Sequence, residues 1–96
     1  MEEEETVSVH VVVQGKVQGV GFRIFTEQEA NQRGLHGWVR NHPDGTVEVE
    51  AEGPRPEVEA FIKILREGPK FSHVSQIIVD WKDANRHTHG FTIQRS

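Results

Sequence analysis

The stretch VSVHVVVQGKVQGVGFR, residues 7–23, decides the fold of this 96-residue chain. Its first half places a valine at every second position: Val7, Val9, Val11 and Val13. Such a period of two is typical of a strand with one buried face. Val12 adds apolar surface on the other face, as expected for a strand inside a sheet. Three glycines then break the alternation, so the stretch predicts a strand, a glycine-rich loop and a helix start in direct succession.

Two later segments have helical character. The first, FRIFTEQEANQR at 22–33, places Phe22, Phe25, Glu29 and Ala30 near one stripe, and Gly34 follows as a suitable C-cap. The second lies within residues 53–69, where Gly68 and Pro69 end the helix. Its apolar positions follow helical spacing: Val58, Phe61, Ile62 and Leu65.

The remaining apolar segments read as strands. Residues 35–41 and 46–52 flank HPDG, whose proline and Asp-Gly favour a turn, and together they predict a hairpin with one wet face. Residues 74–81 form a third alternating region, with Ile77, Val79 and Trp81 on one face. A short last strand at 91–95 turns Phe91 and Ile93 inward.

The resulting order, β-α-β-β-α-β, predicts an α+β sandwich of the ferredoxin-like plan. Its sheet is mixed but mainly antiparallel, with two helices on one face. We expect residues 1–6 to form an acidic flexible tail and residues 7–96 to form a single domain.

The composition of the chain limits which classes of binding partner are expected. Glu2 to Glu5 account for the whole net charge of −4 and leave eleven acidic and eleven basic residues, which argues against general nucleic-acid binding. The chain has no cysteine, which excludes disulfides and thiolate zinc sites. It contains no apolar run of membrane-spanning length and no signal-peptide pattern at its N-terminus. A cytoplasmic monomer that does not engage a membrane is the expectation.

The glycine-rich loop has the chemistry of an anion site. Gly15, Gly19 and Gly21 permit positive φ, so successive backbone N–H groups can face one centre, and the helix start adds unpaired N–H groups. Two familiar nucleotide loops do not fit. Phe22 and Arg23 replace the Lys-Ser/Thr of a Walker A loop, and Ile24 stands where a dinucleotide loop needs its third glycine. A single terminal phosphoryl group fits better.

Arg23 adds a cation to the predicted helix start. With no anion present, this placement costs a few tenths to about 1 kcal/mol, whereas a bound phosphate accepts a bidentate pair from the guanidinium. The alternative is an exposed ion pair with Glu27, although a base preceding an acid is the weaker i,i+4 order. The anion site is therefore the favoured interpretation.

Two motifs carry a family resemblance. GKVQGVGFR at 15–23 resembles the signature loop of the acylphosphatases, and GLHGWVRN at 34–41 is similar to their second signature. The resemblance extends from residue 7 to residue 95. It implies hydrolysis of the carboxyl-phosphate bond of small acyl phosphates, without a metal or cofactor. The sequence departs from the family at Gly21, where many relatives carry a bulkier residue.

The resemblance also implies roles for individual residues. Arg23 binds the phosphate together with loop backbone amides, and Asn41 orients the attacking water. The loop amides are those of Gln18, Gly19, Val20, Gly21 and Phe22. An acyl phosphate is a mixed anhydride with a good leaving group, so positioning and charge stabilisation suffice and no nucleophilic side chain is needed. Asn41 has both a donor and an acceptor for holding water. Without the resemblance, Asn41 is better explained as a turn former before His42 and Pro43.

Other interpretations remain. His87 and His89 lie near Asp80 and Asp83, but two histidines in a predicted loop are weak evidence for a metal. Glu48, Glu50 and Glu52 alternate as a solvated face, and Trp38 is a core or half-covered residue near the predicted site. The same fold order also suits a non-catalytic anion-binding domain or, less well, an RNA-recognition module.

Overall fold

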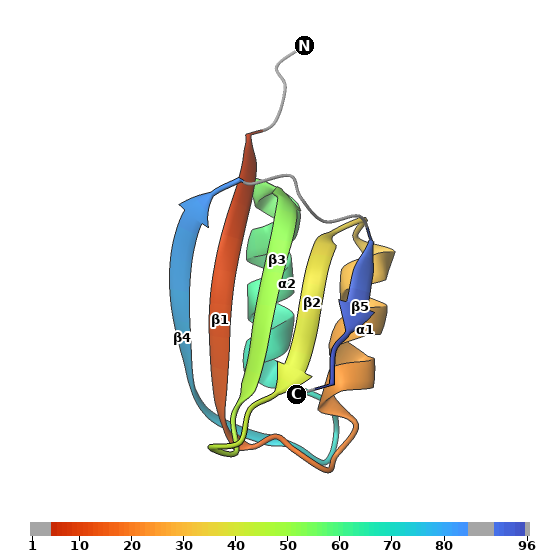
Figure 1. Ribbon diagram of the computed structural model, residues 1–96, viewed down its shortest axis with the longest axis vertical. Coiled ribbons are helices and arrows are strands. Elements are labelled where there is room, and N and C mark those ends of the chain that lie inside the picture. The colour runs from red at the N-terminus through yellow and green to blue at the C-terminus, as the bar shows by residue number, and fades with distance from the viewer. Residues whose placement is uncertain (1–4, 85–89, 96) are drawn as a thin grey trace.

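A computed structural model describes residues 5–84 and 90–95 of the protein. The elements follow in the order β1 (Thr6–Lys16), α1 (Phe22–Gln32), β2 (His36–Asn41), β3 (Val47–Pro54), α2 (Arg55–Glu67), β4 (His73–Asp83) and β5 (Phe91–Ile93). One sheet contains the five strands in the order β4-β1-β3-β2-β5. Both helices lie against the same face of this sheet (Figure 1). The predicted sandwich is therefore confirmed.

The pairing of the strands agrees with a mixed, mainly antiparallel sheet. β1 pairs antiparallel with both β3 and β4, and β2 pairs antiparallel with β3. β5 adds to the outer edge of β2 in parallel. The alternating valines of β1 explain its inner position, because Val9, Val11 and Val13 are fully buried under the helices. Phe22 of α1 and Phe61 of α2 complete the same core.

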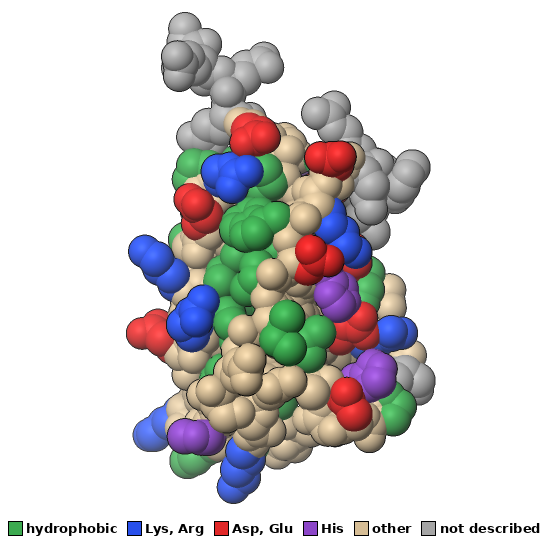
Figure 2. All heavy atoms as spheres, turned by 90° about the vertical axis from the view of Figure 1, so that its left-hand side faces the viewer, with side chains coloured by type: hydrophobic (Ala, Val, Ile, Leu, Met, Phe, Trp, Pro, Cys, Tyr) green, Lys and Arg blue, Asp and Glu red, His purple; other side chains and the backbone are tan. Residues whose placement is uncertain are grey.

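One detail of the core differs from expectation, and a second was not fixed by the sequence. The buried stripe of α1 passes through Thr26 rather than Phe25, because the Thr26 hydroxyl donates to the Phe22 carbonyl at 2.8 Å and is thereby satisfied inside the core. Trp81 is 42% exposed because β4 is an edge strand that the helices cover incompletely. Figure 2, which faces the β4 side of the molecule, shows hydrophobic side chains on that surface.

The first strand begins one residue earlier than expected. Thr6, placed in the tail by its sequence, is the first residue of β1. The Glu5 carboxylate forms an ion pair with Arg55 Nε at 3.1 Å. The Glu5 backbone carbonyl accepts a hydrogen bond from the Arg55 backbone N–H at 2.9 Å. Among the described residues, no helix is long and apolar enough to cross a membrane.

The sheet brings three connections to one end of the molecule. The glycine-rich loop between β1 and α1, the turn between β2 and β3, and the connection from α2 to β4 lie together at the lower end in Figure 1. Both predicted motifs reach this end, because β1 runs into the loop and β2 finishes at Asn41. The site is therefore sought here.

Candidate active site

At Gly19 and Gly21, glycine is required by backbone conformation rather than by lack of space. Gly19 and Gly21 have φ of +74° and +79°, in the left-handed region, and a Cβ on either would meet no other atom within 4 Å. Gly21 is also the N-cap of α1 and supplies no side-chain hydrogen bond. No acidic residue lies in the first turn of α1. The partial positive charge of the helix start is therefore not offset locally by a carboxylate.

A small pocket opens beside this helix start. It has a volume of about 100 Å³ and is lined by Val17, Gly19, Gly21, Phe22, Arg23, Ile24 and Asn41. The pocket joins residues of the two sequence motifs, since Arg23 comes from α1 and Asn41 from the end of β2. Pockets for drug-sized ligands start at about 300 Å³, so this one suits a small group rather than a whole nucleotide.

Arg23 lies half-buried in the first turn of α1. Among the described residues its guanidinium forms no ion pair, and the alternative contact with Glu27 is not made. The i,i+4 pair on this helix joins Arg33 and Glu29 instead, at 2.8 Å. The charge of Arg23 is thus free to meet an anion in the pocket.

Asn41 is the last residue of β2 and pairs with Val47, the first residue of β3. It therefore precedes the turn rather than forming it, which removes the turn-former explanation. Gln18 and Val20 do not line the pocket with the other predicted loop residues. Val20 instead packs, half-buried, against the hydrophobic core. The pocket thus collects five of the seven predicted site residues.

Hydrogen bonds close the turn after Asn41. The His42 backbone N–H donates to the Thr46 carbonyl at 2.9 Å, and the Gly45 N–H donates to the His42 carbonyl at 3.0 Å. Asp44 Oδ1 accepts from both the hydroxyl and the backbone N–H of Thr46, at 2.6 and 2.9 Å. The Thr46 hydroxyl, followed by its backbone N–H, lowers the pKa of Asp44. The predicted HPDG turn is confirmed, with Asp44 as its anchor.

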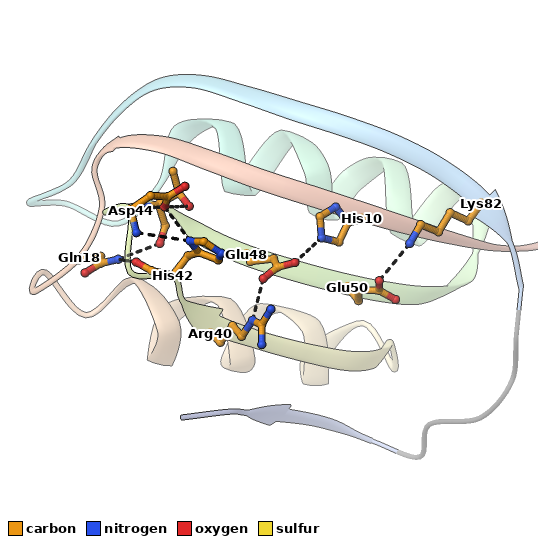
Figure 3. A network of polar contacts seen from close by, with 9 residues as sticks. His10, Gln18, Arg40, His42, Asp44, Glu48, Glu50 and Lys82 are labelled. Atoms are coloured by element: carbon orange, nitrogen blue, oxygen red, sulfur yellow. Dashed lines mark hydrogen bonds and ion pairs between the residues drawn. The ribbon is translucent and has the colours of Figure 1, made fainter. Parts of the chain in front are cut away.

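The side chain of Gln18 has a contact that the sequence did not reveal. Its Nε2 donates at 2.8 Å to the carbonyl of His42 and at 2.8 Å to the carbonyl of Thr46 (Figure 3). The loop before α1 is thereby joined to the turn after Asn41. No local sequence signal indicates this contact, because its partners lie 24 and 28 residues away along the chain.

The sheet face opposite the helices carries ion pairs instead of isolated carboxylates (Figure 3). Glu48 contacts His10 at 2.6 Å and Arg40 at 2.7 Å. Burial raises the pKa of Glu48, but hydrogen bonds from His10 and Arg40 and the Arg40 charge outweigh it, and the net pKa is lowered. Glu52 is only 6% exposed. The expectation of a uniformly solvated glutamate face was therefore wrong.

Two further candidates lie away from the pocket. Trp38 is half-buried and does not line the pocket. The Arg40 guanidinium lies over the Trp38 ring, 5.2 Å from the ring centroid. His87 and His89 lie outside the described residues. Within the part of the chain that the structure describes, no three His, Cys, Asp or Glu side chains gather as a possible metal site.

The fold and the pocket define a class: small α/β sandwiches with a glycine-rich loop facing the end of the second strand. The family model for Acylphosphatase matches residues 9–93. A protein named acylphosphatase from Salinibacter ruber is 45% identical over 92 residues, covering 96% of this chain and 95% of the relative. The protein belongs to the acylphosphatase family, as the two motifs indicated.

Solved structures agree with this membership. The crystal structure of acylphosphatase from Bacillus subtilis matches with a TM-score of 0.89 at 41% identity, covering 92% of this chain and 98% of that chain. Full-length HypF, in a phosphate- and nucleotide-bound form, matches with a TM-score of 0.87 at 31% identity, but the match covers only 12% of that chain. Family and fold together support an enzyme that acts on acyl phosphates.

Proposed function

We propose that the protein hydrolyses acyl phosphates to a carboxylate and inorganic phosphate, and that the pocket beside α1 is its active site. The observation that carries this proposal is the meeting of Arg23 and Asn41 in one small pocket at a helix N-terminus. The pocket offers a charge for the phosphoryl oxygens and an amide for a water. These are the two functions that cleavage of an activated anhydride requires.

The phosphoryl group is held by Arg23 and by the backbone amides of residues 18–22. A helix start with no acidic side chain in its first turn favours an anion, and the guanidinium neutralises charge on two phosphoryl oxygens at once. Charge on the equatorial oxygens persists through a loose phosphoryl-transfer transition state. Fixed donors in a small pocket therefore stabilise the transition state without reorganising.

Asn41 orients the attacking water in line with the bond to the leaving carboxylate. Its carboxamide accepts one hydrogen bond from the water and donates another, but it does not take a proton at neutral pH. The proton therefore passes from the water to a phosphoryl oxygen of the substrate. The P–O bond to the carboxylate breaks as the new P–O bond forms, and the carboxylate leaves with its electron pair.

A metal or cofactor has no part in this proposal, and we further propose that the protein works as a cytoplasmic monomer. The alternative is an anion-binding domain without turnover. It is favoured by one observation, that the same fold forms a small part of full-length HypF. An assay of turnover distinguishes the two functions. An enzyme and an anion-binding domain would both bind phosphate, but only the enzyme would release phosphate from an acyl phosphate.

The experiment measures phosphate release from benzoyl phosphate in the presence of a chelator. The wild type is expected to turn over, and Arg23→Gln to lose more than about 100-fold in kcat/KM. Arg66→Gln, on the exposed face of α2, is the matched control and should leave the rate unchanged. Phosphate binding without turnover in the wild type would favour the anion-binding domain.

A further inference from the structure

The Gln18 side chain donates both of its N–H groups to the turn between β2 and β3. Its partners are two backbone carbonyls, those of His42 and Thr46, each at 2.8 Å from Nε2. Because carbonyls only accept hydrogen bonds, the nitrogen of the amide must face them. Each carbonyl also accepts one backbone N–H within the turn, from Gly45 and His42 respectively. Gln18 thus fills the second acceptor position of both.

These two carbonyls flank Asn41 and its partner in the sheet. His42 follows Asn41 directly, and Thr46 directly precedes Val47, which pairs with Asn41 across the β2–β3 ladder. Gln18 therefore bonds to both sides of the β2–β3 hairpin, next to Asn41 and its pairing partner. In the described part of the chain, no other hydrogen bond joins residues 17–22 to residues 42–46.

The contact joins two parts of the pocket that come from separate elements. Gly19, directly after Gln18, lines the pocket on the loop side, and Asn41 lines it on the sheet side. A displacement of reacting groups by about 1 Å can cost about 100-fold in rate. The distance between a bound phosphoryl group and a water held by Asn41 depends on how firmly loop and hairpin are joined.

We propose that Gln18 is a positioning residue that sets Asn41 and its water against the phosphate loop. The inference rests on the proposed function of the pocket. The Gln18 side chain acts through two backbone carbonyls, those of His42 and Thr46, and not through the reacting atoms. Its side chain is therefore expected to matter for the rate of the chemical step, and to matter only while Asn41 is present.

A double-mutant cycle tests this dependence. Gln18→Met keeps the length of the side chain and removes both donors, and Asn41→Ala removes the water-holding amide. We expect Gln18→Met to lower kcat about 10- to 100-fold, while competitive inhibition by inorganic phosphate weakens less than about threefold. In the Asn41→Ala background, Gln18→Met should lower kcat less than about threefold further. Gln28→Met, exposed on α1, is the matched control.

A purely structural role predicts another pattern. Independent losses multiply, so an equal fold loss from Gln18→Met with and without Asn41 would overturn the inference. Gln18→Asn, whose amide is one methylene too short to reach the carbonyls, repeats the cycle if the methionine variant does not fold. Wild type without turnover would remove the proposed function itself. Turnover with independent effects would remove only the role of Gln18.

Discussion

Arg23, in the first turn of α1, and Asn41, the last residue of β2, line the same pocket of about 100 Å³. They are brought together because β1 leads into the glycine-rich loop and β2 ends beside it. The guanidinium has no carboxylate partner among the described residues. This pairing of an unneutralised cation with a neutral amide underlies the predictions on catalysis below.

Gly21 should tolerate a side chain sterically but not conformationally. Gly21→Ala is expected to lower the free energy of unfolding by about 1 kcal/mol, because φ is +79° while the new Cβ meets open space. Gly37→Ala should cost well over this amount, since its Cβ would lie 2.0 Å from the Glu50 carbonyl oxygen. Urea unfolding of both variants checks the contrast. A loss of stability in Gly21→Ala as large as that in Gly37→Ala would contradict the open space around Gly21.

Ile24 should influence which acyl group is accepted. It lines the pocket yet is 56% exposed, so an apolar acyl group bound there would cover it. Ile24→Ala is expected to lower the ratio of kcat/KM for benzoyl phosphate over acetyl phosphate about five- to tenfold, which corresponds to about 1 kcal/mol of lost apolar contact. Ile78→Ala, also exposed but on β4, is the control. An unchanged ratio would place the acyl group elsewhere.

Glu48 should stabilise the fold only above acid pH. Its pKa is lowered from 4.5 in the folded protein, so it binds protons less readily than in the unfolded chain. The stabilisation is therefore present above about pH 4.5 and is lost as pH falls through the lower folded value. Glu48→Gln should lower Tm at pH 7, and the difference from wild type should shrink by pH 3. A gap independent of pH, or one matched by the exposed control Glu59→Gln, would contradict this account.

The site of bond cleavage is open to isotope labelling. If water attacks phosphorus, one turnover in ¹⁸O-enriched water places the label in inorganic phosphate and none in the carboxylate. Mass spectrometry of both products distinguishes this from attack at the acyl carbon. Label in the carboxylate would require a different role for Asn41.

Local sequence patterns predicted much of this arrangement, and their limits are physical. The valine alternation of β1 predicted its buried face, and the glycines followed by Arg23 predicted an anion site where the structure has a small pocket. The exposure of Trp81 could not be predicted, because alternation shows which face a side chain lies on but not whether its strand lies at the sheet edge. The Gln18 contact arises only when two connections meet in the folded chain.

The most direct test is the kcat of Asn41→Ala on benzoyl phosphate, measured together with inhibition by inorganic phosphate. Asn31→Ala, exposed on α1, controls for the substitution itself. If Asn41 holds the water and Arg23 the phosphate, kcat falls more than about 100-fold while the inhibition constant for phosphate changes less than about threefold. A folded Asn41→Ala variant with wild-type kcat would contradict the account.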